Sequence, residues 1–441
     1  AAVERGVDSE IATPEDEPYA SMFAGNTVEL CPVGALTSRQ YRFKARPWDL
    51  VRTPSICNGC AVGCNVEVHS RSESVRRLVA RPEPSIDDGW LCDRGRFHSL
   101  PDRSEQRAAR PMIRGGDGVL APTSWDQALA RAGDLLGTGG GVLASAGLSN
   151  EALWALERLG QRLPGALWPP AGEAWPVQGR IQHLQECRTI VLVGLDVWND
   201  LPILALWIRK AVLGGAKLIV LGEDNGLWRD TSLWLKGDPL DKLDEVTATI
   251  QAGGPTALLA HPSMVSQGRA RLEAAARVLG ASGERGIVGA PLLGSNGRGA
   301  SELAPTLAQG DVDLVLTSKA LLAIGDEPWA ELHAGSFARL VLATSQAIPE
   351  DPRIDVTLPM AHAYERQASI TNLEGRVQHQ EGGAAPRPHA RADWGIVLEL
   401  ADRLGLSLSI SEDLDALRTG IVEQHPAFAE IRREEALVAR V

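Results

Sequence analysis

The stretch Cys57-Asn-Gly-Cys60-Ala-Val-Gly-Cys64, joined by Cys92 further along the chain, determines how the rest of the sequence is interpreted. The four cysteines have the spacing C-x2-C-x3-C-x27-C. Three thiolates at short intervals, with a fourth returning from a distant turn, can surround one [4Fe–4S] cluster. Structural zinc is the main alternative, but zinc ligands more often come as two matched C-x2-C pairs, and neither Cys64 nor Cys92 has a partner two residues on. The spacing therefore favours an iron–sulfur site and leaves zinc open.

The composition sets limits on the class of protein. The chain has 441 residues, of which 44% are hydrophobic, enough for two or three domains with sizeable cores. Its formal net charge of −12 argues against nucleic-acid partners, which require a basic surface. Five of the six cysteines fall within the first 92 residues, which indicates thiols kept for metal in a reducing compartment. The most apolar stretch, 201–221, is interrupted by Arg209, Lys210 and Lys217, so we expect no direct membrane span.

The pattern of apolar, turn-forming and cysteine residues changes along the chain and predicts four segments. Residues 1–46 are short and turn-rich, and residues 47–103 hold the four cysteines among strand-like stretches around Val66, Val68 and Val75. These patterns predict a small β-rich metal domain over 47–103. From 104 to 405 strands and helices alternate, and 406–441 is interpreted as a C-terminal tail.

The third segment has the pattern of a doubly wound α/β domain. A strand over 189–193, a helix that begins at Pro202 and a strand over 217–221 form a β-α-β unit. Apolar runs at 256–260, 313–317 and 339–343 are interpreted as further buried parallel strands. Ser124-Trp-Asp-Gln127 has the form of a helix capping box, and 394–404 predicts a last amphipathic helix. The fold class is therefore α/β, with one or two Rossmann-like units after the metal domain.

Four further stretches carry a resemblance to a known family. They are Ser21–Ser38, which includes Cys31-Pro-Val-Gly-Ala-Leu36, together with Tyr41–Trp48, Gly89–Phe97 and Glu365–Gln378. With the cysteine spacing and the α/β units, they resemble the large iron–sulfur subunit of bacterial respiratory complex I, the G subunit of NADH:quinone oxidoreductase. That subunit is a branch of the molybdopterin oxidoreductase superfamily. The resemblance covers most of residues 5–405.

The resemblance implies roles for five cysteines. Cys57, Cys60, Cys64 and Cys92 match the ligands of the family's additional [4Fe–4S] cluster. Cys31 matches the fourth ligand of a second [4Fe–4S] cluster, whose other three ligands would lie upstream. Because the sequence starts at Ala1 without those ligands, we expect that it is truncated at its N-terminus and that 1–46 is the remnant of an N-terminal iron–sulfur region.

The resemblance also implies a function and partners. It predicts an electron-transfer and scaffold subunit of the peripheral arm, relaying electrons from NADH and FMN toward quinone. Expected partners are the flavin- and NADH-binding subunit and the hydrogenase-like subunits of the quinone module. The expected location is peripheral, at the cytoplasmic side of the bacterial inner membrane. The chain would be an enzyme only as a subunit, with no complete catalytic site and no molybdopterin in its α/β domain.

Two other functions stay open at this stage. A working molybdopterin-dependent oxidoreductase, such as a formate dehydrogenase or nitrate reductase, usually needs a protein ligand to its metal, and the corresponding stretch 141–150 offers only Ser145 or Ser149. The second open function is that of a zinc-stabilised protein without redox activity. Arg94 is interpreted either as a residue that tunes the cluster or as a surface ion pair. The turn around Asn372 and Glu374 is expected to stabilise a junction between domains.

Overall fold

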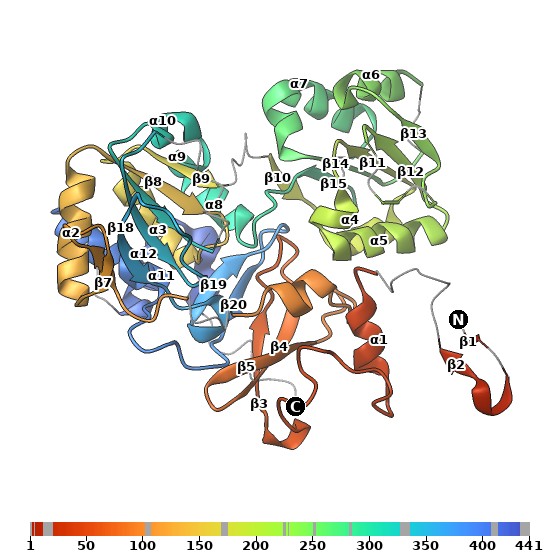
Figure 1. Cartoon of the computed structure of the whole chain (residues 1–441). Coiled ribbons are helices and arrows are strands. Elements are labelled where there is room, and N and C mark those ends of the chain that lie inside the picture. Colours follow the sequence, from red (N-terminus) through yellow and green to blue (C-terminus); the bar gives the residue numbers. More distant parts are fainter. Residues whose placement is uncertain are drawn as a thin grey trace.

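The computed structural model shows three folded units that lie against one another (Figure 1). Two α/β units stand side by side, and a small β-rich unit packs beneath both of them. The structure describes residues 2–3, 5–11, 21–101, 107–168, 175–223, 226–227, 229–249, 253–281, 285–326, 336–406 and 413–432. At the N-terminus a short hairpin of β1 (Ala2–Val3) and β2 (Glu10–Ile11), with η1 (Gly6–Asp8), lies away from the three units.

The small unit is an antiparallel sheet that holds the cysteine segment. Its strands are β3 (Val51–Ile56), β4 (Asn65–Arg71) and β5 (Ser74–Ala80), paired in the order β3-β4-β5. Helix α1 (Ala24–Leu30) and the single turn η2 (Pro47–Asp49) precede the sheet, and the π-helical turn η3 (Arg94–His98) follows it. Val66 and Val68 on β4 are fully buried, which confirms the predicted small β-rich unit.

The first α/β unit is built on a seven-stranded sheet with the order β7-β6-β18-β17-β16-β8-β9. The strands are β6 (Met112–Arg114), β7 (Leu120–Pro122), β8 (Gly140–Ser145), β9 (Gly165–Trp168), β16 (Ala320–Ile324), β17 (Arg339–Thr344) and β18 (Ile354–Pro359). The five strands from β18 to β9 run parallel, whereas β6 and β7 form an antiparallel edge. Among the parallel strands the chain begins at β8 and extends the sheet on both sides, so a topological switch point lies between β8 and β16.

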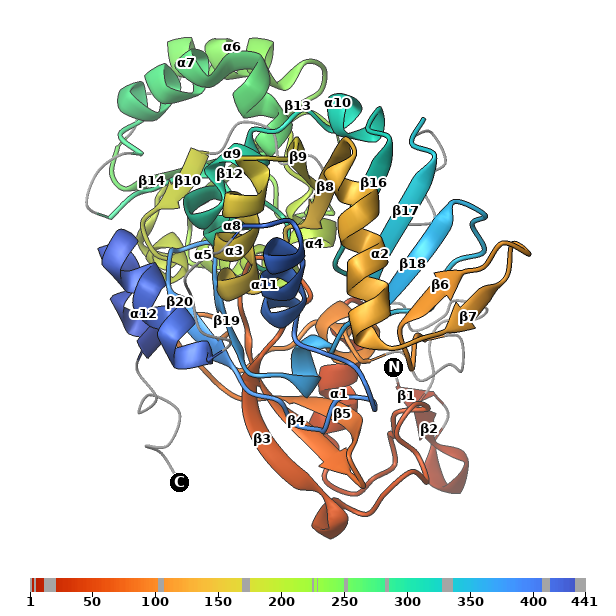
Figure 2. The same cartoon turned by 90° about the vertical axis from the view of Figure 1, so that its left-hand side faces the viewer.

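Helices cover both faces of this sheet. Successive strand residues alternate between two cores, as the two-residue period of a strand requires: Val142 and Ala144 face one core, and Leu143 faces the other. Figure 2 shows α2, α3 and α11 on the larger core, and α10 belongs to the other. The helices of this unit are α2 (Trp125–Gly137), α3 (Asn150–Gly160), α8 (Gly297–Leu303), α9 (Pro305–Ala308), α10 (Val312–Leu316) and α11 (Asp393–Arg403).

The second α/β unit is inserted between β9 and β16 of the first. Its sheet has the order β10-β15-β14-β11-β12-β13, parallel except for β10. The strands are β10 (Trp175–Gln178), β11 (Thr189–Val193), β12 (Lys217–Leu221), β13 (Leu233–Leu235), β14 (Thr256–Ala260) and β15 (Ile287–Ala290). Its helical segments are η4 (Ile181–Glu186), α4 (Val197–Asp200), α5 (Pro202–Leu213), α6 (Pro239–Thr249) and α7 (Pro262–Val278). Helix α5 packs between this sheet and the cysteine unit, and α6 and α7 cover the opposite face.

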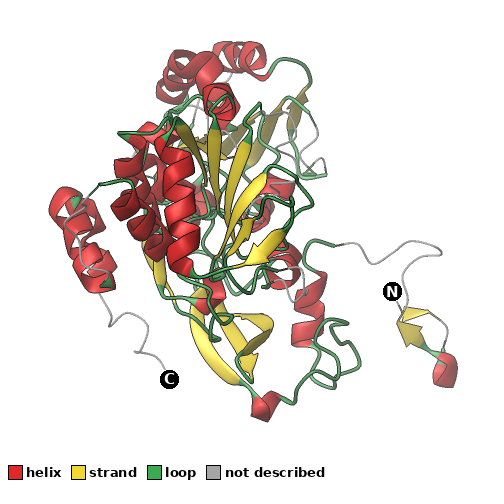
Figure 3. Cartoon of the chain, turned by 60° about the vertical axis from the view of Figure 1, so that its left-hand side comes forward, coloured by secondary structure: helices red, strands yellow, loops and turns green. Residues whose placement is uncertain are grey.

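The C-terminal part connects the units. A hairpin of β19 (Ala368–Thr371) and β20 (Val377–Gln380), reached through the turn η6 (Ala363–Glu365), lies between the first α/β unit and the cysteine unit (Figure 1). Beyond α11, the segment interpreted as a tail contains α12 (Leu414–Gln424) and η7 (Pro426–Arg432). Leu417 and Ile421 of α12 belong to the large core, so this segment packs onto the body; Figure 3 shows the C-terminal helical segments at the side of the molecule, next to the helices of the first α/β unit. Among the described residues, no helix combines the length and apolar character needed to cross a bilayer.

The α/β prediction is confirmed, with two doubly wound units, and one predicted strand is wrong. Runs 256–260 and 339–343 form β14 and β17, whereas 313–317 lies in helix α10 and the turn after it. The Asp311 carboxylate accepts a hydrogen bond from the Leu314 amide and so caps this helix. Val315 is buried while Leu314 is 59% exposed, the one-sided burial of a surface helix. A short apolar run cannot separate these two structures by its pattern alone.

Candidate metal centre

The fold brings the four spaced cysteines together in one buried cluster. Cys57 follows β3, Cys60 and Cys64 lie in the loop that returns to β4, and Cys92 lies just before η3. The Cys57 amide donates to the Cys64 carbonyl at 2.8 Å and closes the loop. The side chains are only 3–6% exposed and share one apolar core with residues of β4, β5 and α5. All four are free of disulfides.

The backbone around the sulfurs is shaped for close approach. The Gly59 amide donates to Cys57 Sγ at 3.3 Å, and the Gly95 amide donates to Cys92 Sγ at 3.4 Å. A Cβ atom at Gly95 would lie 2.8 Å from Cys57 Sγ, so only glycine leaves the sulfur its present place. Amide donors directed at sulfur stabilise thiolates that bind metal. The cradle therefore fits a thiolate-bound group.

The electrostatics of the site also call for a cationic partner. Burial raises the pKa of Cys57 to about 12 and that of Cys92 to about 11. The pKa of Cys64 is raised well above its usual range, again by burial first and then by the charges of the neighbouring sulfurs. Four thiolates in an apolar pocket repel one another unless a positive centre compensates them. Iron or zinc supplies that compensation, because metal binding deprotonates the thiols it takes as ligands.

Iron–sulfur and zinc differ in how the sulfurs must be arranged. A zinc ion needs its four thiolates around one point, whereas each thiolate of a [4Fe–4S] cluster binds a different iron. Within the residues that the structure describes, no three His, Cys, Asp or Glu side chains converge closely enough to hold a single metal ion.

Arg94 links the cysteine unit to the second α/β unit. Its guanidinium donates to the carbonyls of Asn199 and Asp200 at 2.8 and 2.5 Å, at the end of α4. Burial lowers the pKa of Arg94, but the neighbouring sulfurs, Cys60 and Cys92 foremost, outweigh burial and raise it. The alternative of a surface ion pair is therefore wrong, and Arg94 is a cation beside the sulfurs.

Two residues that the sequence analysis did not single out also contact the site. Tyr364 is fully buried, and its hydroxyl accepts from the Asn58 amide at 3.3 Å, next to Cys57. The carboxylate of Asp87 accepts from the Asn65 amide at 2.9 Å, directly after Cys64. Tyr364 immediately precedes the family-like stretch 365–378, which is the one signal that pointed toward it. No pattern in the sequence indicated Asp87.

Cys31 lies apart from the other four and is half-exposed at the end of α1. Backbone amides of the turn 33–36, most strongly that of Leu36, donate toward its sulfur and lower the pKa of Cys31. It borders a cavity of about 700 Å³ between this turn and the sheet of the cysteine unit. A lowered pKa favours the thiolate form of Cys31.

The turn between β19 and β20 bridges two units, as predicted. Asn372 Nδ2 donates to the Val62 carbonyl at 3.3 Å, and Gln378 Nε2 donates to the Gly63 carbonyl at 2.9 Å. On the other side Glu374 Oε1 accepts from the Ile181 amide at 2.5 Å. Hydrogen bonds from the hairpin to the backbone carbonyls of Val62 and Gly63 therefore fix the loop between Cys60 and Cys64.

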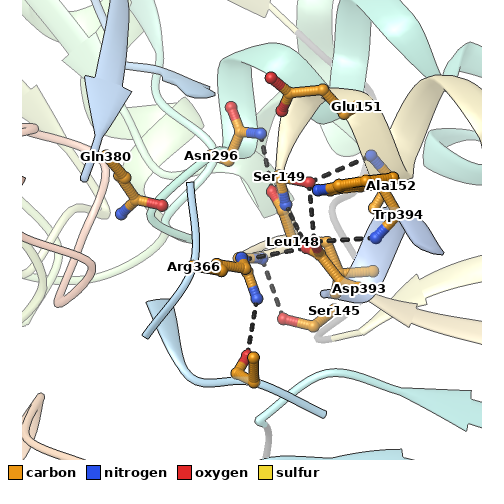
Figure 4. A network of polar contacts seen from close by, with 12 residues as sticks. Ser145, Leu148, Ser149, Glu151, Ala152, Asn296, Arg366, Gln380, Asp393 and Trp394 are labelled. Atoms are coloured by element: carbon orange, nitrogen blue, oxygen red, sulfur yellow. Dashed lines mark hydrogen bonds and ion pairs between the residues drawn. The ribbon is translucent and has the colours of Figure 1, made fainter. Parts of the chain in front are cut away.

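The two candidate molybdenum ligands lie in a buried polar network at the switch point of the first sheet (Figure 4). Ser149 Oγ accepts from the Ala152 amide and donates to Asp393, which in turn pairs with Arg366 at 2.9 Å. Ser145 Oγ accepts from the Gly147 amide at 2.9 Å. Ser149 and Asp393 are fully buried. Ser149 thus serves as the cap of α3 and as the anchor of α11.

Comparisons with known families agree with this arrangement. Residues 50–100 match the molybdopterin oxidoreductase Fe4S4 domain, so the four buried cysteines lie within a recognised Fe4S4 domain. Residues 107–248 and 350–403 match the molybdopterin oxidoreductase family, and the break between them covers the second half of the inserted unit and the stretch from α8 to β17 of the first unit. Residues 1–37, which include Cys31, match the ferredoxin-like domain of NADH-quinone oxidoreductase subunit 3.

Two relatives with similar sequences are both described as the G subunit of NADH-quinone oxidoreductase. The chain is 27% identical to the NADH-quinone oxidoreductase G subunit of Streptomyces coelicolor over 93% of its own length. It is 31% identical to the same subunit of Mycobacterium bovis over 92% of its length. The match spans 60% of each relative. Among solved structures, acetylene hydratase from Pelobacter acetylenicus has the same fold, with a TM-score of 0.59 and 15% identity over 80% of this chain and 69% of that one. The chain is therefore a homologue of the NADH-quinone oxidoreductase G subunit that combines an Fe4S4 domain with the α/β fold of the molybdopterin oxidoreductases.

Proposed function

We propose that this chain is an iron–sulfur electron-transfer and scaffold subunit in the peripheral arm of NADH:quinone oxidoreductase, where it relays electrons from NADH and FMN toward quinone. The observation that carries this proposal is the buried four-cysteine cradle within a chain related to the G subunit over nine tenths of its length. A [4Fe–4S] cluster bound there supplies one-electron transfer. The protein residues bind that cluster, exclude water from it and direct hydrogen bonds at its sulfurs.

The proposed ligands are Cys57, Cys60, Cys64 and Cys92 for one [4Fe–4S] cluster, and Cys31 for one position of a second. The amides of Gly59 and Gly95 and the shared burial of the four sulfurs support the first set. The amides of the turn 33–36 support Cys31. Among the described residues that line the cavity beside that turn, Cys31 is the one cysteine.

The proposal divides the chain into an N-terminal iron–sulfur remnant (1–46), the [4Fe–4S] domain (47–103), an α/β scaffold (104–405) and a C-terminal segment (406–441). The partners are the flavin- and NADH-binding subunit and the hydrogenase-like subunits of the quinone module. The location is peripheral, at the cytoplasmic side of the bacterial inner membrane. NADH oxidation takes place on the flavin subunit, so the chain works in catalysis only as part of the complex.

A molybdopterin-dependent oxidoreductase is the weaker alternative. That function needs a protein ligand to the metal at the switch point of the first sheet, where the sequence offers Ser145 and Ser149. The Ser149 hydroxyl is instead held by Ala152 and Asp393. No observation favours this alternative, and molybdenum in the purified protein would revive it.

The proposal is tested by purifying the complex through a tag on this chain. We expect the flavin subunit and the hydrogenase-like subunits to co-purify, and Cys60→Ser to lower the iron content by about four per chain. Cys187→Ser is the matched control, because Cys187 is buried and its sulfur donates to the His183 carbonyl, at 3.5 Å, in the second α/β unit. A chain that purifies without these subunits, or equal iron in both variants, would contradict the proposal.

A further inference from the structure

Helix α1 is bound to the chain on both sides of Cys92. The buried Asn26 pairs with the backbone of Leu91, the residue before Cys92. Its Nδ2 donates to the Leu91 carbonyl at 2.8 Å, and its Oδ1 accepts from the Leu91 amide at 3.3 Å. On the other side, the Asp93 carboxylate accepts from the Gly25 amide of the helix at 2.8 Å. The helix is therefore fixed against the two residues that flank this cysteine.

The remaining hydrogen-bonding groups of Asn26 are also used. Its Nδ2 donates a second bond to the Phe23 carbonyl at 3.2 Å, and its Oδ1 accepts a second bond from Arg96 at 3.0 Å. Arg96, which is 6% exposed, also forms an ion pair of 2.5 Å with Glu29 in the last turn of α1. Both donors and both acceptors of the amide are thus satisfied, and alanine at this position supplies none of them.

The same contacts border the cavity beside Cys31. Gly25, Glu29 and Arg96 line that cavity together with Cys31. A Cβ atom at Gly25 would lie 2.8 Å from Asp93 Oδ1, so the helix comes as close to this segment as a glycine allows. Because Cys31 directly follows the last residue of α1, its position depends on where the helix is held.

We propose that Asn26 is a positioning residue that holds Cys31 at the second metal site by tying α1 to the segment that carries Cys92. This inference rests on the proposed function, which gives Cys31 one position of a second [4Fe–4S] cluster. The first cluster depends less on Asn26, because three of its four ligands lie in the loop that the hairpin of β19 and β20 fixes separately. Loss of Asn26 therefore weakens the second cluster selectively.

The test is Asn26→Ala in the complex purified through a tag on this chain. Cys31→Ser and Cys60→Ser assign the EPR signals of the second and the first cluster. Residues that orient a metal ligand contribute about 10- to 100-fold to metal affinity, so in the presence of an iron chelator we expect the second signal to disappear faster by about that factor. The first signal should change much less. Thr27→Ala is the matched control, since it places alanine at an exposed position of the same helix.

A second variant, Asn26→Asp, tests the same role if Asn26→Ala does not assemble. Aspartate has the same size and keeps acceptors for the Leu91 amide and for Arg96, but it loses the donor to the Leu91 carbonyl. The second cluster should then be lost faster than in the unmodified complex and more slowly than in Asn26→Ala.

Two results would overturn the inference. One is a second cluster that is lost from the Asn26 variants no faster than from Thr27→Ala, and the other is an equal acceleration at both clusters, which would make Asn26 a general support of the cysteine unit. An unmodified complex without a signal that depends on Cys31 would instead refute the second cluster of the proposed function.

Discussion

Replacement of Asp87 by alanine should loosen the two segments that carry Cys64 and Cys92. The Asp87 carboxylate is 1% exposed and accepts from the amides of Asn65, Glu83 and Gly89 at 2.9, 3.0 and 2.9 Å. It therefore ties the start of β4 to the loop that leads to Cys92. Burial raises the pKa of Asp87 to about 6, so at pH 7 the group is the carboxylate that these amides hold.

The expected magnitude follows from which donors lose their only partner. The Asn65 residue is buried, whereas Glu83 and Gly89 are partly exposed and can bond to water. One buried donor left unsatisfied costs about 1–3 kcal/mol, and the two others add less, so we expect local opening to become easier by about 2–3 kcal/mol. That corresponds to a roughly 30- to 140-fold faster amide exchange at Asn65.

The assay is hydrogen–deuterium exchange at pH 7, resolved to the peptides around Asn65 and over 81–92. Asp88→Ala is the control, because the neighbouring Asp88 is exposed and pairs with Lys210 at the surface. Exposed pairs contribute about 0–1 kcal/mol, so exchange in the control should change less than about fivefold. Equal exchange at Asn65 in Asp87→Ala and Asp88→Ala would refute the role given to Asp87.

Three further outcomes are expected. Arg418→Leu leaves the fully buried Glu151 without its ion pair of 2.9 Å, which should destabilise the α/β body by about 3–5 kcal/mol and lower its melting temperature; an unchanged value would contradict this. Burial lowers the pKa of His362 to about 4, so stability should fall as pH drops from about 6.5 to 4, by up to about 3 kcal/mol, and His362→Asn should flatten that dependence in thermal scans. Iodoacetamide should modify Cys31 well before the four buried cysteines, as mass spectrometry of the native protein would show; labelling of Cys57 at the same rate would contradict the burial of the site.

The order of segments and the main strands could be predicted from the sequence because local patterns determine them. Four consecutive apolar residues at 257–260, preceded by Gly-Gly-Pro-Thr, mark a strand buried on both faces. The run 313–317, Asp-Leu-Val-Leu-Thr, also has consecutive apolar residues at its centre, but Asp311 caps it and one side faces solvent. The nesting of the second unit inside the first depends on pairing between β8 and β16, strands more than 170 residues apart, and no local signal encodes that contact.

The candidate site also contains residues that local sequence patterns predict and residues that only the packing between units brings there. Short spacing brings Cys57, Cys60 and Cys64 into one loop, so the clustering of these cysteines could be predicted from the sequence. Tyr364 and Asp87 could not, because each reaches the site through packing between units rather than through a motif. For Arg94 the sequence left a role beside the cysteines and a surface ion pair open, and its anchors, the main-chain carbonyls of Asn199 and Asp200, could not be predicted because a carbonyl contact requires no particular residue type.

The most direct measurement is the content of iron, acid-labile sulfide, zinc and molybdenum in the anaerobically purified chain, with EPR after reduction. The account predicts about four irons and four sulfides per chain, no molybdenum, and a reduced-cluster signal that Cys60→Ser abolishes. Zinc without sulfide would contradict the account and leave a non-redox scaffold. Molybdenum would contradict it differently, by making the α/β body an active site.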